Sequence, residues 1–179
     1  MTFIHTTHVG SLPRTPELAA LLLKRDHGEK IDEAAFDALV SSEIEKAIRA
    51  QVKAGVSIVS DGELGKVGYS TYVTGRLSGF GGHVDRTPAK DLADLPELRT
   101  KLAAIMGSQS FVRAACIGKV ELVDSKPVDD DIRRFSAAMA KEGHSVRGFM
   151  NAASPGLVTA FQPNQYYPTH EAYLADLIE

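Results

Sequence analysis

A long amphipathic helix that leads through one glycine into a short apolar strand constrains this fold more than any other feature of the sequence. Between residues 32 and 54, apolar side chains recur every three or four positions and form one stripe: Phe36, Leu39, Val40, Ile44, Ala47, Ile48 and Val52. Asp32 suits the N-cap position, and Gly55 suits the position just beyond the helix end. The apolar run Val56–Ser60 follows at once, which predicts a helix–strand unit of an α/β protein.

The rest of the chain continues this alternation. The predicted strands are Thr2–Val9, Ser110–Ile117, Lys119–Val123 and Ser145–Asn151. A further helix is predicted to start after Thr15, its N-cap, with Pro16 as its first residue. Two more span Asp129–Glu142 and Ala153–Phe161, and a last helix has Thr169 as its N-cap. Strands that alternate with helices predict an α/β fold with a mostly parallel sheet.

Composition narrows the class of protein. The chain has 179 residues, so we expect a single domain over residues 1–179. Its residues are 44% hydrophobic and 24% charged, which excludes a disordered chain, and the net charge of −3 argues against a nucleic-acid partner. The longest apolar run, Leu18–Leu23, is too short for a membrane span, and no secretory signal is evident. We therefore expect a soluble, cytoplasmic protein with no membrane partner.

A single cysteine, Cys116, excludes an intrachain disulfide and a metal site built on a pair of cysteines. In a parallel α/β sheet, the chemistry lies in the loops that follow the carboxyl ends of the strands. This rule selects three loops here: Val9–Arg14, Asp61–Tyr69 and Asn151–Pro168.

Each of these loops offers polar groups, and each also has a purely structural interpretation. In the first, Ser11 and nearby backbone amides either hold a small anionic or amino-acid ligand or form a simple turn. In the second, Glu63 either binds a substrate ammonium group or acts as a base, and Asp61 either orients a second group or accepts backbone amides in a tight turn. In the third, Asn151 and Ser154 are placed to hydrogen-bond a ligand.

Three ordered motifs carry a resemblance to a known family. They are Thr6–Arg14, Ala54–Glu63 with the following Tyr72 to Phe80, and Ala153–Gly156 with Asn164 to Tyr167 and Glu171 to Leu174. Together they resemble the catalytic barrel of cobalamin-independent methionine synthases. The last motif is similar to the branch that includes methionine synthase II-like proteins and epoxyalkane–coenzyme M transferase.

The resemblance implies the N-terminal half of a (β/α)₈ barrel in a family of zinc-dependent thiol methyl- and alkyltransferases. The parent activity is methionine biosynthesis by transfer of a methyl group from a methyltetrahydrofolate to homocysteine. By motif, Val9 and Ser11 would contact the amino-acid part of the thiol, and Glu63 would bind its ammonium group. Asp61, Asn151 and Ser154 would line the same pocket.

The sequence departs from the family where the metal is bound. The family's zinc ligands, a His-x-Cys pair, a Glu and a further Cys, lie in the second half of the barrel, and this chain has no His-x-Cys. A complete barrel needs about 250 residues. We therefore expect a truncated barrel, inactive alone, that forms a homodimer or pairs with a chain carrying the C-terminal half.

Other functions remain open. A non-catalytic interaction protein could retain the half-barrel, and an epoxyalkane–coenzyme M transferase-like fragment would use a thiol without an amine. A uroporphyrinogen decarboxylase-like fragment fits less well, because the early loops show no cluster of arginines to hold a polycarboxylate.

Overall fold

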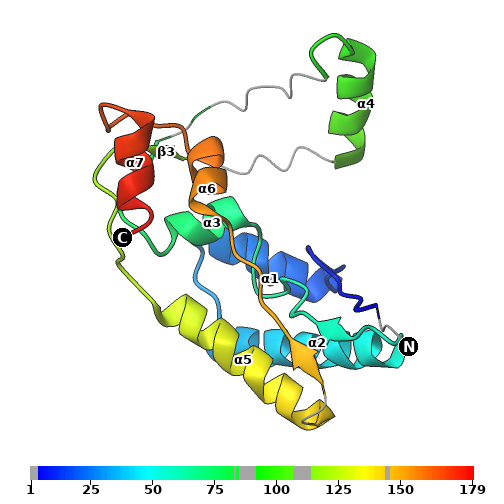
Figure 1. The fold of residues 1–179 in the computed structure, drawn as a ribbon. Helices are drawn as coiled ribbons and strands as arrows, with labels where there is room; N and C mark the ends of the chain where they lie inside the picture. The colour runs from blue at the N-terminus through cyan, green and yellow to red at the C-terminus, as the bar shows by residue number, and fades with distance from the viewer. Residues whose placement is uncertain (1–3, 83, 85–91, 107–113, 144–145) are drawn as a thin grey trace. The chain divides into compact units, whose positions relative to one another are not determined.

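The computed structural model describes residues 4–82, 84, 92–106, 114–143 and 146–179 (Figure 1). The chain divides into two compact units, each built from two segments. The first unit comprises Met1–Arg76 and Leu122–Ser154, and the second comprises Leu77–Glu121 and Pro155–Glu179. That residues 1–179 form one partial-barrel domain stays a prediction.

Helices α1 (Pro16–Asp26), α2 (Glu33–Lys53), α3 (Tyr69–Thr74) and α5 (Lys126–Glu142) belong to the first unit. The predicted helix starts at Thr15 and Asp32 are confirmed, because Thr15 Oγ1 accepts the amide of Leu18 and Asp32 Oδ1 accepts the amides of Ala34 and Ala35. Two differences stand out. Helix α5 begins three residues before its predicted start, and α3 was not predicted.

Three segments of the first unit run parallel. Strand β1 (Ile58–Val59) pairs with β4 (Arg147–Gly148), and Thr7 forms a parallel bridge to Ile58 on the other side. The order is the Thr7 segment, β1, then β4, and the pairing is parallel, as the helix–strand alternation predicts. Each strand is shorter than predicted. Residues 1–3 and 144–145, which the predicted strands Thr2–Val9 and Ser145–Asn151 include, lie outside the described residues.

The main core lies between the helices and strands of the first unit. The predicted stripe of α2 supplies much of it, and the buried members are Leu18, Leu22, Phe36, Val40, Ile44, Ile48, Val59, Leu64, Phe135 and Ala138. Helices α2 and α5 pack on each other, and each fully buried Ile or Val contributes about 1.5–3 kcal/mol relative to exposure. This core supports the loop that follows β1.

The second unit contains β2 (Phe80–Gly81), α4 (Pro96–Met106), β3 (Ala115–Cys116), α6 (Pro155–Phe161) and α7 (His170–Asp176). Strand β2 was not predicted, and it pairs antiparallel with β3, an exception within the mostly parallel pairing that the sequence predicts. The amides of Ile117 and Gly118 both donate to Gly79 O beside this pair, and the chain between the two strands includes α4. A smaller core contains Cys116, Val120 and Tyr173.

Among the residues described, β3 is the strand found within the predicted strands Ser110–Ile117 and Lys119–Val123. Residues 107–113 lie outside that description. The architecture as a whole is a mixed α/β fold with few, short strands. Over the described parts of the chain, no helix has both the length and the apolar character needed to cross a bilayer.

Candidate functional site

The loop after β1 turns sharply at two successive residues with left-handed backbone. Gly62 has φ +61° and Glu63 has φ +55°. This conformation is energetically unfavourable for any residue that carries a side chain. Leu12 N donates to Gly62 O at 2.9 Å, so the first predicted loop holds the second. The result is that Glu63 is buried, with 7% of its surface exposed.

The Glu63 carboxylate is held from two sides. Ser11 Oγ donates to Glu63 Oε2 at 2.7 Å, and Asn151 Nδ2 donates to Glu63 Oε1 at 2.7 Å. The three residues follow the Thr7 segment, β1 and β4, the three parallel segments of the first unit. Parallel strands bring their carboxyl ends to one edge, which explains why residues so distant in sequence meet.

Arg14 acts on the backbone of this loop. Its Nη2 donates to Glu63 O at 2.8 Å and to Lys66 O at 2.5 Å. Burial lowers the pKa of the Arg14 guanidinium, and the nearby Glu63 carboxylate opposes that shift. Arg14 therefore fastens the two ends of the turn together.

Asp61 is buried beneath the same loop. Its Oδ1 accepts the amide of Glu63 at 3.1 Å, and its Oδ2 accepts Lys66 Nζ at 3.2 Å. These bonds match the alternative in which Asp61 shapes the turn. Its predicted place in the lining of a ligand pocket stays a prediction.

Lys66 joins two acidic residues in the interior. Besides Asp61, its Nζ lies 3.3 Å from Asp131 Oδ2 of α5. Tyr72 donates its hydroxyl to Asp131 Oδ2 at 2.7 Å, and Arg134 Nη1 donates to Asp131 Oδ1 at 3.1 Å. Burial first, and then the bond to Asp131, raise the pKa of Tyr72 far above its ordinary value, so the phenol stays protonated as a donor.

The end of β1 has one further support that the sequence did not reveal. Gln51 of α2 donates from Nε2 to Ser60 O at 2.9 Å and accepts the Ser60 amide on Oε1 at 3.0 Å. All of these atoms are buried. Gln51, Lys66 and Asp131 lie outside the predicted site. The signal available in advance was the position of Lys66, three residues after Glu63.

The predicted site residues therefore divide into three groups. The structure brings Ser11, Glu63 and Asn151 into direct contact. It places Asp61 behind the turn, paired with Lys66. Val9 is 64% exposed, and Ser154 is an exposed residue at the end of the first unit. The ligand contacts assigned to all six residues stay predictions.

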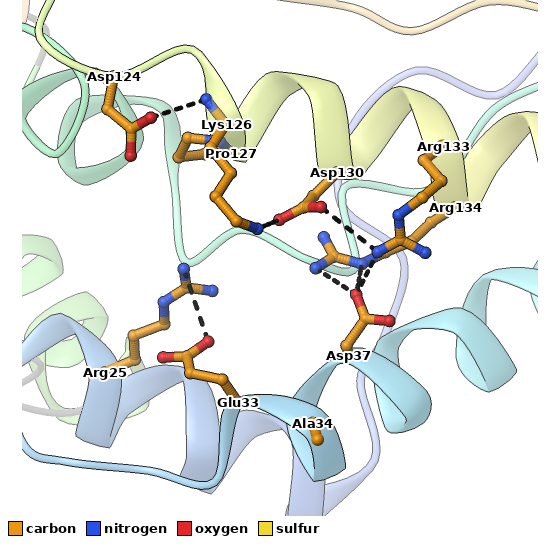
Figure 2. A pocket seen from close by; sticks show the side chains of 10 residues that line it. All are labelled: Arg25, Glu33, Ala34, Asp37, Asp124, Lys126, Pro127, Asp130, Arg133 and Arg134. Atoms are coloured by element: carbon orange, nitrogen blue, oxygen red, sulfur yellow. Dashed lines mark hydrogen bonds and ion pairs between the residues drawn. The ribbon is translucent and has the colours of Figure 1, made fainter.

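A cavity of about 440 Å³ lies between the N-terminal turns of α2 and α5 and the end of α1 (Figure 2). It is lined by Arg25, Glu33, Ala34, Asp37, Asp124, Lys126, Pro127, Asp130, Arg133 and Arg134. Figure 2 shows the guanidinium groups of Arg133 and Arg134 converging on Asp37, while Lys126 pairs with Asp130. Four cations face four acids, so the lining has no net charge to select a charged ligand.

Within the described parts of the chain, no group of three or more His, Cys, Asp or Glu side chains is arranged to hold a metal ion. Cys116 lies in the second unit, fully buried, and burial raises the pKa of its thiol. The residues described do not build the zinc site that the family resemblance implies.

Known proteins share parts of this sequence. Residues 3–89 match the family model for the catalytic domain of cobalamin-independent synthases. The methionine synthase of Pyrococcus furiosus is 24% identical over 181 residues, which cover 100% of this chain and 46% of that protein. A 5-methyltetrahydropteroyltriglutamate–homocysteine methyltransferase of Synechococcus is 35% identical over 75 residues, or 42% of this chain and 10% of that protein.

Solved structures of the same kind share the fold. A B12-independent methionine synthase of Shewanella, determined with selenomethionine, aligns with a TM-score of 0.60 and 16% identity, over 96% of this chain and 44% of that one. A putative B12-independent methionine synthase of Listeria monocytogenes aligns with a TM-score of 0.58 and 16% identity. The chain spans less than half the length of these proteins. The resemblance predicted from the motifs is confirmed.

Proposed function

We propose that this chain, a relative of the cobalamin-independent methionine synthases, forms the substrate half of a (β/α)₈ barrel that alkylates an amino-acid thiol of the homocysteine type. One observation carries the proposal. The buried carboxylate of Glu63 is fixed by Ser11 and Asn151 where three parallel segments end. A carboxylate held in this way is suited to bind the ammonium group of an amino acid.

Charge and burial explain why Glu63 would select an amine. Each carboxylate oxygen accepts more than one hydrogen bond, so an ammonium group can join the donors already present. Glu63 is nearly buried, and attraction between opposite charges strengthens as water is excluded. Ser11 and Asn151 fix the carboxylate plane, so the direction of the incoming N–H groups is set before the ligand arrives. Selenomethionine in the Shewanella structure, itself an amino acid, supports this ligand class.

Thiol activation is not assigned to any described residue. The family resemblance implies zinc, whose ligands we expect outside this chain, and a metal-bound thiol is deprotonated at neutral pH. We therefore propose that the chain acts in an assembly, either as a homodimer or with a second chain that carries the C-terminal half of a barrel. In this assembly, the contribution of this chain is to bind and orient the amino-acid end of the thiol.

Calorimetric titration of the full chain with two thiols tests the proposal. L-Homocysteine carries the amine, and 2-mercaptoethanesulfonate lacks it. We expect Glu63→Gln to weaken homocysteine binding about 10- to 100-fold, because a charge-assisted hydrogen bond contributes about 1.5–3 kcal/mol. Glu45→Gln, the same exchange at a residue of α2 that pairs with Lys141 of α5 outside the site, is the matched control and should bind as the parent chain does.

Two results would contradict the proposal. Equal loss of both thiols in Glu63→Gln would exclude an ammonium contact and favour a general structural effect. Preferential binding of 2-mercaptoethanesulfonate would point instead to the transferases that use a thiol without an amine. Native mass spectrometry of the same sample reports the oligomeric state, and a purely monomeric chain that binds homocysteine would remove the need for an assembly in substrate binding.

A further inference from the structure

We propose that Lys66 and Asp131 are positioning residues, which act through Asp61 to hold Glu63 in the conformation that meets its ligand. Neither residue was singled out by its sequence motif. That the ligand is an amino-acid thiol rests on the proposed function. That a buried ion network sets the position of the Glu63 carboxylate follows from the contacts described next.

The three charged side chains at the centre of the network are all nearly inaccessible. Side-chain exposure is 5% for Lys66, 3% for Asp61 and 5% for Asp131. Lys66 Nζ lies 3.2 Å from Asp61 Oδ2 and 3.3 Å from Asp131 Oδ2, so one cation joins two anions. Buried charges of this kind persist only when their partners neutralise and hydrogen-bond them.

The network reaches Glu63 through its backbone. Asp61 Oδ1, the oxygen not bonded to Lys66 Nζ, accepts a hydrogen bond from the amide of Glu63, and the amide of Lys66 donates to Glu63 O at 3.1 Å. Glu63 adopts φ +55°, which a non-glycine residue keeps only when its surroundings enforce it. The turn from 61 to 66 is thus closed at both ends by groups of the same network.

Helix α5 approaches the turn closely at Gly65, where the residue type leaves space for the Asp131 carboxylate. A Cβ on Gly65 would lie 3.2 Å from Asp131 Oδ1 and 3.3 Å from Val40 Cγ1, so the absence of a side chain leaves room for the carboxylate. Tyr72 and Arg134 then complete the hydrogen bonds of Asp131. The carboxylate of Asp131 is thus held by two donors, Tyr72 and Arg134, in addition to the loop residue Lys66.

The test measures the Glu63 carboxylate without any ligand. Asn151 donates its side-chain amide to Glu63, so the ¹H–¹⁵N signal of that amide reports whether the carboxylate is in place. Glu63→Gln supplies the reference signal for a site without the carboxylate. We expect Lys66→Met to move the Asn151 signal towards that reference, and Lys66→Arg to restore it. Lys46→Met, which removes a largely exposed lysine on α2, should leave the signal in place.

Circular dichroism shows whether Lys66→Met folds. If it does not fold, a milder variant replaces it. Tyr72→Phe removes one hydrogen bond from Asp131 and should move the Asn151 signal part of the way in the same direction. A folded Lys66→Met or Tyr72→Phe chain with an unmoved signal would overturn the proposal. Recovery in Lys66→Arg separates placement of Glu63 from a general loss of packing.

Titration with L-homocysteine then separates this inference from the proposed function. If the parent chain binds homocysteine, Lys66→Met should weaken binding at least tenfold while Lys46→Met binds normally. If the parent chain does not bind homocysteine but the Asn151 signal moves as expected, the positioning role holds and the proposed function fails. Normal homocysteine binding by a folded Lys66→Met chain would overturn the positioning role.

Discussion

The turn at Gly62 and Glu63 places two residues in succession in the left-handed region, and they bear this conformation differently. Gly62 has no side chain to clash, and a Cβ there would lie 2.6 Å from Leu12 Cδ1. Glu63 has a side chain, and it is held by Ser11, Asn151, Arg14 and the hydrogen bond that its backbone amide donates to the Asp61 carboxylate. Gly62 therefore adopts the turn without a steric clash, whereas Glu63 is kept in it by these hydrogen bonds.

Gly62→Ala should destabilise the first unit by about 2–5 kcal/mol. Left-handed backbone costs an alanine about 1–2 kcal/mol, and overpacking against Leu12 adds about 1–3 kcal/mol. Gly55→Ala is the matched control, because Gly55 has φ +79° but open space around its Cα. Urea unfolding followed by circular dichroism should show a loss of about 1 kcal/mol for the control. Equal losses in both variants would contradict the contact with Leu12.

At this scale the sequence predicted the contacting set only in part. Ser11, Glu63 and Asn151 could be found because each follows a predicted strand, and parallel strands end at one edge. Lys66 and Asp131 could not, because their pairing depends on how α5 packs against the β1 loop. Val9 was selected by motif alone, and it is largely exposed in the first unit.

Helices α2 and α5 are joined by an ion triad as well as by their apolar faces. Arg133 and Arg134 of α5 both contact Asp37 of α2, at 2.6 and 2.8 Å. Burial alone would raise the pKa of Asp37, but the hydrogen bonds from the two arginines outweigh it, so the pKa lies below its ordinary value of 3.8. The carboxylate therefore binds a proton less readily in the folded chain than in the unfolded chain.

This direction predicts how the contribution of Asp37 depends on pH. The stabilisation is fully present above the ordinary pKa of 3.8 and is lost as the pH falls through the lower folded value. Asp37→Asn should therefore lower the free energy of unfolding at pH 7 by about 1 kcal/mol. The effect is smaller than for a buried ion pair, because a third of the Asp37 side chain is exposed. Urea unfolding at pH 7 and pH 3 should show the difference from the parent chain shrinking in acid. A constant difference would contradict the ion triad.

Periodicity predicted the elements that span several turns better than the short ones. The stripe on α2 and the caps of α1, α2 and α7 are local features, written within a few adjacent residues. The β2–β3 pair is antiparallel although α4 lies between its two strands in the chain, a tertiary outcome that strand propensity does not encode. Helix α3, with six residues, is too short to show a period.

The two units differ in the size of their cores, and this difference concerns the molecule as a whole. The core of the first unit draws on three helices and a strand, whereas that of the second centres on Cys116, Val120 and Tyr173. A smaller core buries less apolar surface and opens at lower free energy. Cys116 is a natural reporter, because it is fully buried and burial raises the pKa of its thiol above 9.0.

Thiol labelling of Cys116 should therefore become rapid at lower urea concentration than the main loss of helical circular dichroism. Tyr173→Ala should accelerate labelling in water more than tenfold, because Tyr173 is fully buried in the same cluster. Tyr166→Ala is the matched control, since that ring is 53% exposed. Coincident labelling and dichroism transitions would show instead that the two units unfold as one.

The amide of Gln51 has a consequence for how such a site changes over evolutionary time. It offers one donor and one acceptor to the backbone of Ser60, the same pair that a neighbouring strand would offer. A helix side chain thus makes the two backbone hydrogen bonds that a neighbouring strand would make at Ser60, just after β1 ends. Glutamate lacks the donor and asparagine lacks the reach. The backbone at the start of the loop after β1 therefore depends on a helix residue that precedes it, and Gln51 contacts Ser60 through the backbone of Ser60 alone.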